Sequence, residues 1–295
     1  MEIDTIVEMG EKFINLCEAS NVNYTSSIIT NGYLLSPEVM ERLISVKVGN
    51  IQITLDGLKE AHDCRRFLVG GKPTFDTIIE NIKKLRPLFK AKKTFFPSIG
   101  IRMNLDKSNC LGMEELMDYL YKSPIHEYTT FYIAGVFDIN DVNNDYTFTQ
   151  AEYLEYNEKY LNLLKKLDQK EYYEDYYPKM ISSFCGCDVI SSFVIDSDGT
   201  LYKCWEEIGH VDTSIGNIKE IFSANLVNNP WYYSNILLDP TLDDKCSKCK
   251  ILPNCMGGGC PHRVNYLKSK VDCEAKMSEH RCNIIKSYEI LKRNK

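Results

Sequence analysis

The sequence has no long apolar run, no excess of basic residues and only 5 histidines among 295 residues. Without a stretch of about 20 apolar residues, no membrane-spanning helix is expected. The first residues, MEIDTIVEMGEKF, are acidic and amphipathic, so they do not resemble a signal peptide. The 35 basic and 41 acidic residues give a formal charge of −6, which offers no reason to expect nucleic acid or an anionic membrane as partner. These absences predict a cytoplasmic protein.

Cysteine, in contrast, is abundant. The chain has 12 cysteines, and nine of them lie between Cys185 and Cys282. Disulfides are disfavoured in a reducing compartment, so this concentration of thiols indicates metal ligands. The three outside it, Cys17, Cys64 and Cys110, are expected to be small buried apolar residues.

The first half of the chain alternates predicted strands and helices. Strands are expected within residues 24–32, 49–57, 97–109 and 128–139, and helices within 3–20, 36–46, 74–89, 112–123 and 151–167. This alternation is typical of βαβ units and a parallel sheet. Four strands are too few for a closed eight-stranded barrel, so we predict an α/β fold with a partial barrel or an open sheet. A tyrosine-rich, acidic stretch near residue 170 marks a domain boundary, giving domains 1–168 and 169–295.

Polar residues fall at or just past the predicted strand ends. They are Asn31, Asp56, Asn104 and Asp106. Ligands of α/β folds bind at the carboxyl ends of parallel strands. We therefore expect a ligand site at this edge of the sheet.

The segment 141–152 has oxygen-bearing side chains at the spacing of a calcium loop. Tyr146 stands where such a loop needs glycine for its sharp turn. Thr149 and Glu152 also have the spacing of a capping box for the following helix. We therefore favour helix capping over calcium binding.

The spacing of the clustered cysteines leaves two kinds of metal site open. One zinc ion would take four ligands, the number supplied by Cys246-x2-Cys249-x5-Cys255-x4-Cys260. That leaves five cysteines of the cluster without a role, whereas eight thiolates match two 4Fe–4S clusters. The soft ligand set fits either metal. Three glycines, 257–259, favour clusters, since their backbone can approach a bulky core and donate N–H groups to its sulfurs.

The cysteine pattern resembles the SPASM domain of radical S-adenosylmethionine (radical SAM) enzymes. The resemblance covers residues 187–282 and departs from the family at the x4 spacing before Cys260. It implies that the first auxiliary cluster is held by Cys187, Cys204 and Cys260, with Cys185 as candidate fourth ligand. It implies Cys246, Cys249 and Cys255 for the second cluster, with Cys282 preferred to Cys273 as the final ligand.

The first half is similar to the barrel of the same family. The stretches that carry the likeness are TNG, ITLDG and His62-Asp63-x-x-Arg66. The resemblance implies that S-adenosylmethionine is bound by Asn31, Thr54, Arg66 and Asn104. A guanidinium such as that of Arg66 can grip the methionyl carboxylate bidentately. Together the two likenesses imply a partial radical SAM barrel followed by a small cysteine-rich SPASM domain.

Family membership implies an oxidoreductase that modifies peptides. Its partners would be a ribosomally made peptide or protein substrate and a reductant such as ferredoxin or flavodoxin. The family's CxxxCxxC motif, which holds the radical-generating cluster, does not occur in these residues. We therefore expect a truncated, split or degenerate member that does not cleave S-adenosylmethionine alone, and no catalytic residue can be named. The alternatives are an electron-transfer or partner subunit and a zinc-stabilised structural module.

Overall fold

The computed structural model describes residues 2–91, 95–138, 145–168, 176–181, 185–220, 226–234, 236–257 and 273–293. The chain divides into two compact units, Met1–Gln169 (unit 1) and Lys170–Lys295 (unit 2). Among the helices of the described residues, none combines the length and the apolar character that a bilayer crossing requires.

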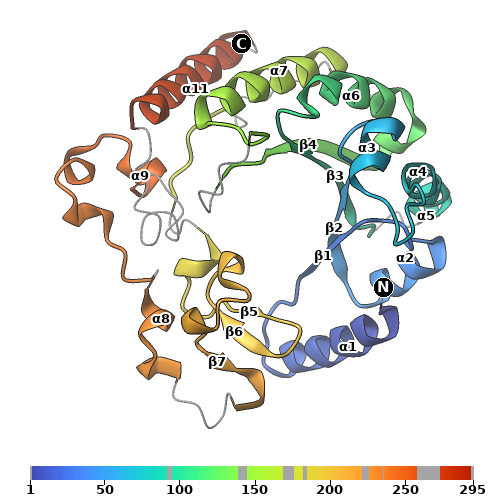
Figure 1. Ribbon diagram of the computed structural model, residues 1–295, viewed down its shortest axis with the longest axis horizontal. Coiled ribbons are helices and arrows are strands. Elements are labelled where there is room, and N and C mark those ends of the chain that lie inside the picture. Colours follow the sequence, from blue (N-terminus) through green and yellow to red (C-terminus); the bar gives the residue numbers. More distant parts are fainter. Residues whose placement is uncertain are drawn as a thin grey trace. The chain divides into compact units, whose positions relative to one another are not determined.

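Unit 1 is built on a parallel sheet of four strands. The strands are β1 (Ser26–Thr30), β2 (Val48–Thr54), β3 (Ser98–Leu105) and β4 (Thr129–Gly135), hydrogen-bonded in the order β1-β2-β3-β4 (Figure 1). The predicted α/β alternation with a parallel sheet is thus confirmed. The described strands form an open sheet with β1 and β4 at its edges, so no closed barrel is present in this part of the chain.

The helices of unit 1 follow the predicted pattern, except that one predicted helix is divided and that α3 was not predicted. They are α1 (Ile3–Ala19), α2 (Pro37–Ser45), α3 (Lys59–Arg65), α4 (Phe75–Lys84), α5 (Arg86–Ala91), α6 (Met113–Lys122) and α7 (Gln150–Asp168), with 3₁₀ turns at Cys110–Gly112 and Pro124–Glu127. Ser36 caps α2 by accepting a hydrogen bond from Val39 N at 3.2 Å, as its position before Pro37 predicts. The helix expected over 74–89 is divided at Leu85, because Pro87 cannot donate to a preceding carbonyl.

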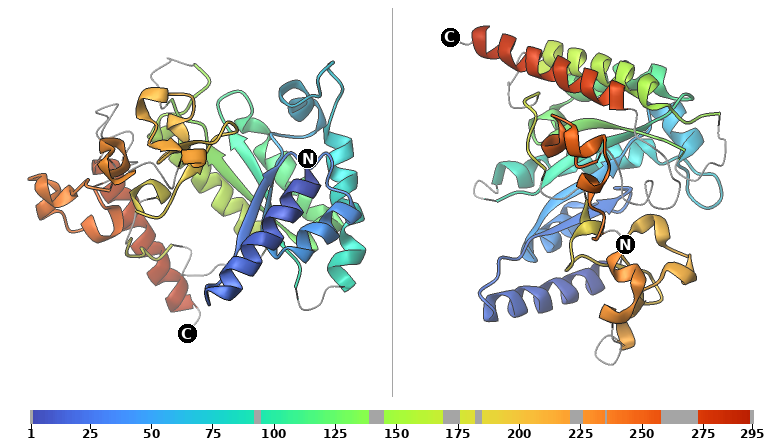
Figure 2. Two further views of the ribbon diagram at one scale, coloured as in Figure 1. Left: turned by 90° about the horizontal axis from the view of Figure 1, so that it is seen from below. Right: turned by 90° about the vertical axis from the view of Figure 1, so that its left-hand side faces the viewer.

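The two faces of this sheet differ in chemistry. Alternate strand residues such as Ile51, Ile53 and Ile101 are buried with the apolar sides of α2, α4 and α6. These helices lie together on one side of the sheet (Figures 1 and 2). The strand residues between them point to the opposite side and form what we call the polar sheet face. Its polar members are Ser27, Asn50, Gln52, Thr54, Ser98, Arg102, Asn104, Thr130 and Tyr132, and Ile29, Gly100 and Ala134 lie on it as well.

Helix α1 packs closely on the rest of unit 1 through a glycine. A Cβ placed on Gly10 would lie 2.8 Å from Cβ of Val46, at the end of α2. With Gly10 facing Val46, the apolar residues Met9 and Phe13 of the same helix are 53% and 50% exposed. The apolar spacing predicted the helix correctly, but the buried side is centred on Gly10.

Unit 2 consists of short elements around a small core. An antiparallel sheet has the order β5-β6-β7. Asp198-Gly199, a dipeptide typical of hairpin turns, lies between β5 and β6, with Gly199 at φ 89°. The elements are β5 (Val194–Ile195), β6 (Thr200–Tyr202), β7 (Gly216–Asn217), α8 (Pro230–Tyr233), α9 (Leu252–Cys255) and α11 (Cys273–Arg293), with 3₁₀ turns at Gly186–Asp188, Trp205–Glu207, Val211–Thr213, Ile218–Glu220, Leu226–Asn228, Pro240–Leu242 and Cys246–Lys248. Its buried apolar cluster is Leu201, Ile215 and Tyr232.

Candidate functional site

The four residues expected to bind S-adenosylmethionine lie at the carboxyl edge of the sheet. Thr54 ends β2 and pairs in register with Arg102 of β3, whose Nε donates to Oδ1 of Asn104 at 2.8 Å. Asn31 follows β1 directly and accepts a hydrogen bond from Tyr33 N at 3.0 Å, which fixes the turn after the strand. Strand direction therefore brings Asn31, Thr54 and Asn104 to one edge, as the sequence predicts.

Asp56 connects the remaining residue, Arg66, to this edge. The Asp56 side chain is nearly buried, and its Oδ2 accepts a hydrogen bond from Arg66 Nε at 2.6 Å. Its Oδ1 accepts a hydrogen bond from the backbone N–H of Asn104 at 3.1 Å. Charge-assisted bonds of this kind are strong and directional. One carboxylate thus joins the end of β2 to β3 and to Arg66.

A second arginine, which the sequence reasoning missed, strengthens the same edge. Arg65 contacts Asp106 Oδ2 at 2.7 Å through Nη2 and donates to Ser108 Oγ at 2.7 Å through Nη1. Burial alone would raise the pKa of Asp106, but the hydrogen bonds from Arg65 and Ser108 hold it below its usual value. The signal that could have found Arg65 is the doubled arginine that follows Asp63 and Cys64.

His62 and Asp63 hold the loop that carries Arg66. Asp56 N donates to Nδ1 of fully buried His62 at 3.3 Å, and His62 Nε2 lies 3.1 Å from Thr74 Oγ1. The Thr74 hydroxyl donates to the carbonyl of Arg66, so the proton between the two side chains belongs to Nε2. Burial lowers the pKa of His62, consistent with this neutral tautomer. Asp63 accepts hydrogen bonds from Thr74 N and Phe75 N at 2.8 and 2.9 Å, which satisfies the start of α4.

The polar sheet face is hollowed toward the amino ends of its strands. A pocket of about 350 Å³ there is lined by Asn50, Gln52, Gly100, Tyr132 and neighbouring residues. The Tyr132 hydroxyl donates to Gln52 Oε1, which lies two strands away. The bond passes over Gly100, where a Cβ would lie only 3.1 Å from the Tyr132 ring. This pocket has no charged lining residue, and it combines polar side chains with those of Ile28, Ile29 and Ile51.

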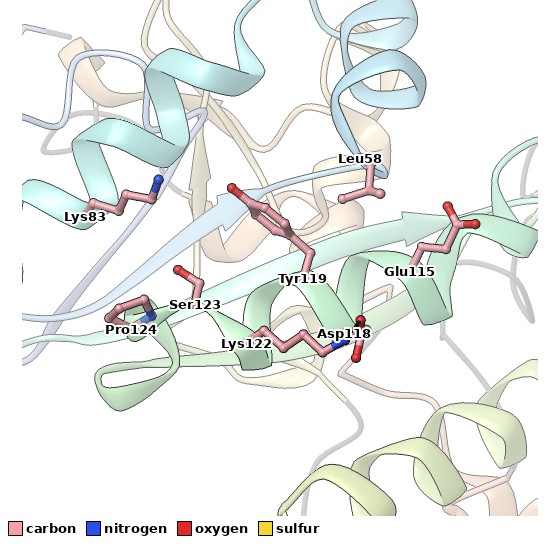
Figure 3. A pocket seen from close by; sticks show the side chains of 8 residues that line it. All are labelled: Leu58, Lys83, Glu115, Asp118, Tyr119, Lys122, Ser123 and Pro124. Carbon is pink, nitrogen blue, oxygen red and sulfur yellow. Dashed lines mark hydrogen bonds and ion pairs between the residues drawn. The ribbon is translucent and has the colours of Figure 1, made fainter.

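A pocket of about 510 Å³ lies on the helix side of unit 1 (Figure 3). It is lined by Leu58, Lys83, Glu115, Asp118, Tyr119, Lys122, Ser123 and Pro124. The lysines that line it are already paired, Lys122 with Asp118 at 2.6 Å and Lys83 with Glu80 at 2.9 Å. It shares no residue with the carboxyl edge of the sheet, and we assign it no ligand.

The end of the segment with calcium-loop spacing caps a helix, as favoured from the sequence. Glu152 N donates to Thr149 Oγ1 at 3.2 Å, and Thr149 N donates to Glu152 Oε2 at 2.7 Å. This reciprocal pair is the predicted capping box of α7. The bonds from Thr149 and Lys107 lower the pKa of Glu152 to about 2. Residues 139–144 lie outside the described residues.

Three thiols of unit 2 converge on its small sheet. Cys185 Sγ lies 2.9 Å from Cys187 Sγ, and Cys187 and Cys204 are both buried. Burial raises the pKa of Cys187, and Cys185 and Cys204 add to the effect, so the three groups are near enough to interact. Cys260, expected to complete this set, lies outside the described residues, as do Gly258 and Gly259.

A second set of thiols gathers around α9 and the start of α11. Burial raises the pKa of Cys255, with further contributions from Cys249 and Cys273 that Lys276 opposes. Burial likewise raises the pKa of Cys246 and is the largest cause. Interactions with Asp243, Cys273 and Cys255 raise this pKa further. Cys255 also lines one pocket of about 530 Å³ with Lys276 and Glu279, so the first turn of α11 lies beside α9.

Cys282, preferred from the sequence as the last ligand, is exposed on α11. Nine residues along an α-helix correspond to roughly 13 Å, so Cys282 lies well beyond Cys273. Of the other cysteines, Cys110 is buried as expected, whereas Cys64 is exposed and Cys17 half-buried. The expectation of a buried apolar residue is therefore wrong for Cys64.

The two thiol sets have the ligand chemistry of a soft metal, but in the described residues their side chains are not arranged around a common point. In the described ranges, no three His, Cys, Asp or Glu side chains are already arranged to hold a metal ion. The donors in both sets are nevertheless thiols from separate segments, the chemistry that iron–sulfur clusters require. The residues present therefore fit a thiolate-ligated group whose binding would draw the segments together.

The chain matches a protein family, a relative of known activity and several solved structures. The Radical SAM superfamily matches residues 2–107. A cysteine-type anaerobic sulfatase-maturating enzyme of Clostridium novyi (strain NT) is 25% identical over 317 residues, covering 95% of this chain and 77% of that protein.

Solved structures of similar fold carry bound ligands. Native anSMEcpe with bound AdoMet and Cp18Cys peptide has a TM-score of 0.67 at 18% identity, covering 98% of this chain and 82% of that one. Native anSMEcpe with bound AdoMet has a TM-score of 0.64 at 18% identity, with the same coverage. At this identity the structures establish a shared fold.

Proposed function

We propose that the chain, whose residues 2–107 match the radical SAM superfamily, is a member of it and supports radical modification of a peptide substrate. The observation that carries the proposal is that unit 1 has polar side chains at the carboxyl edge of its sheet and unit 2 has two thiol sets. A similar structure holds both AdoMet and a peptide, which supports a peptide as substrate class. We keep the remaining predictions, a ribosomally made substrate, a ferredoxin or flavodoxin as reductant and a cytoplasmic location, as part of this proposal.

We place AdoMet at the carboxyl edge of β1 to β3, beside Asn31, Thr54, Arg66 and Asn104. Arg66 is bonded to Asp56 through Nε, so the outer edge of its guanidinium can face the methionyl carboxylate. The amide groups of Asn31 and Asn104 can donate or accept hydrogen bonds to the nucleoside and amino-acid parts. Asp56, His62 and Asp63 hold this arrangement in place before AdoMet binds.

We propose that the domain predicted over residues 169–295, which corresponds to unit 2 (Lys170–Lys295), is a SPASM domain with two auxiliary 4Fe–4S clusters. Cys187, Cys204 and Cys260, with Cys185, would hold the first cluster. For the second we propose Cys246, Cys249, Cys255 and, in place of Cys282, Cys273, because it interacts with Cys246 and Cys255. When bound, such clusters supply one-electron transfer to or from the site of reaction.

AdoMet binding tests the assignment of unit 1. In calorimetric titration of the full chain, Asn104→Ala is expected to raise the dissociation constant about tenfold, the effect of losing roughly 1.4 kcal/mol of binding free energy. Asn50→Ala is the matched control, since Asn50 lies on the same polar sheet face at the other end of β2. It should bind AdoMet like the unmodified chain. Equal weakening by both substitutions, or no binding by the unmodified chain, would refute the site.

A peptide titration tests the substrate class. Because the relative from Clostridium novyi is a cysteine-type maturating enzyme, we propose a peptide cysteine as the residue recognised. With AdoMet present, a cysteine-containing peptide is then expected to bind more tightly than the same peptide with alanine in place of cysteine. Indistinguishable affinities would remove the support for a thiol-bearing substrate while leaving the AdoMet site untouched.

A further inference from the structure

Lys203 is a buried cation beside the first thiol set. It directly precedes Cys204, and the residue is only 2% exposed. Its Nζ donates to three backbone carbonyls, those of Val189 at 2.8 Å, Ile190 at 3.3 Å and Ser192 at 2.7 Å. An ammonium group has three hydrogens, so all of them are directed at uncharged oxygens.

Two aromatic rings complete the surroundings of this ammonium. The rings of Phe193 and Tyr232 each have their centroid 5.2 Å from Nζ, which is within cation–π range. The Tyr232 hydroxyl donates to the carbonyl of Ile190, one of the acceptors of Lys203, at 3.0 Å. We call these three carbonyls and two rings the Lys203 cage. The cage is built from several segments of unit 2 and fixes the position of the charge.

Burial of a cation against neutral groups alone is energetically unfavourable. Removing an ammonium from water costs several kcal/mol, and carbonyls and rings offset only part of that. The acidic groups that interact with Lys203 are Cys187, Asp188 and Glu207. Cys187 and Asp188 belong to the turn Gly186–Asp188. Glu207 accepts a hydrogen bond from Cys204 N at 3.2 Å. The positive charge thus faces the place where thiolates of the first set would gather.

The hydrogen bonds of Lys203 also connect two segments that are separate along the chain. The carbonyls of residues 189–192 follow Cys185 and Cys187 within a few residues, while Lys203 leads into Cys204. One ammonium therefore joins the segment with two thiols to the segment with the third.

We propose that Lys203 is a positioning residue of the first auxiliary cluster, holding the Cys185–Cys187 segment beside Cys204 and raising the reduction potential of the cluster by its fixed charge. The inference rests on the proposed function, since it requires that unit 2 binds clusters. A thiolate-ligated cluster is anionic and gains a further negative charge on reduction, so a nearby cation favours the reduced form.

The test is Lys203→Met in the full chain after anaerobic reconstitution, with Lys219→Met as control. Methionine keeps a long unbranched side chain without the charge, and Lys219 is an exposed lysine of the same unit. A redox titration followed by electron paramagnetic resonance is expected to show a lower midpoint potential for one cluster of Lys203→Met and no change for Lys219→Met. Loss of about half of the iron from Lys203→Met alone would equally support the proposal, because one of two clusters would then be missing. Iron content and potentials equal to those of the unmodified chain would overturn it.

A second variant covers the case in which Lys203→Met does not fold. Phe193→Leu removes one ring of the cage at a partly exposed position, so water can screen the charge. A smaller shift of the same potential in the same direction is expected, and an unchanged potential would overturn the proposal. If the unmodified chain binds no iron–sulfur cluster, the proposed function itself fails. If it binds two clusters that neither variant affects, only the role of Lys203 fails.

Discussion

His62 links the end of β2 to the start of α4 through a neutral, buried imidazole. Its two nitrogens are engaged by Asp56 N and Thr74 Oγ1, and the side chain is completely inaccessible to water. Protonation of Nδ1 would break the bond from Asp56 N and bury a charge. The proposed AdoMet edge therefore depends on a residue that cannot itself reach a ligand.

Stability of unit 1 is expected to fall as pH falls below 6.5. Burial depresses the pKa of His62 from its ordinary value of 6.5, so below that pH the unfolded chain binds more protons than the folded chain. Its contribution to the free energy of unfolding is therefore present above pH 6.5 and lost at lower pH, down to the folded-state pKa. His62→Gln should flatten this dependence and lower stability at pH 7 by about 1–3 kcal/mol.

Thermal unfolding followed by circular dichroism at pH 7.0 and 5.5 measures this effect. His126→Gln is the control, because His126 is an exposed histidine of the same unit. It should keep the dependence of the unmodified chain. The explanation would be wrong if His62→Gln and His126→Gln lost the same stability between the two pH values.

At the residue scale, positions were predictable where chain direction decides them. Asn31, Thr54 and Asn104 come to one edge because parallel strands end there. Partners were not predictable, because the contact of Arg66 with Asp56 and that of Arg65 with Asp106 depend on the path of α3 in three dimensions. The choice between Cys273 and Cys282 likewise depends on which turn of α11 lies beside α9.

At the scale of elements, α1 gives a case in which helix propensity and packing oppose each other. Alanine is favoured over glycine inside a helix by about 0.5–1 kcal/mol. At Gly10, however, a Cβ would lie 2.8 Å from Val46 Cβ, and overpacking of this kind destabilises by about 1–3 kcal/mol. We therefore expect Gly10→Ala to lower the melting temperature of the chain.

Gly112→Ala is the matched control for this substitution. Gly112 has φ −83°, and nothing lies within 4 Å of the place of its Cβ. It should leave the melting temperature unchanged or raise it slightly. If Gly10→Ala were as stable as Gly112→Ala, the packing of α1 against Val46 would be looser than described.

Most elements of unit 1 were predictable because their local signals agree with their packing. Ser36 and Pro37 mark the start of α2, and strand residues of β2 and β3 alternate between core and polar face. The long helix α11 was not predicted. Few of its residues are buried, among them Ser287 and Ile290, so its sequence has no clear apolar stripe.

At the scale of the whole molecule, the two units differ in what can stabilise them. The core of unit 1 extends from Leu35 to Phe148 and includes buried residues from all the strands β2 to β4. The buried apolar cluster of unit 2 is Leu201, Ile215 and Tyr232. A core of that size supplies little stability, so thiolate–metal bonds are expected to contribute much of the folding free energy of unit 2.

The fold class was predictable from the sequence, because helix–strand alternation in unit 1 leaves few other arrangements. Cysteine spacing alone left the kind of metal site open, whereas the family resemblance implied one set with Cys185, Cys187 and Cys204 and another with Cys246, Cys249 and Cys255. The interactions of these thiols agree with that division, but they favour Cys273 where Cys282 was preferred.

Metal analysis of the anaerobically purified and reconstituted chain tests the central claim most directly. Two clusters predict about eight iron atoms and eight sulfides per chain, falling to about four in Cys273→Ala and staying at about eight in Cys282→Ala. A chain that contained zinc without iron or sulfide would contradict the assignment of unit 2 and, with it, the proposed function.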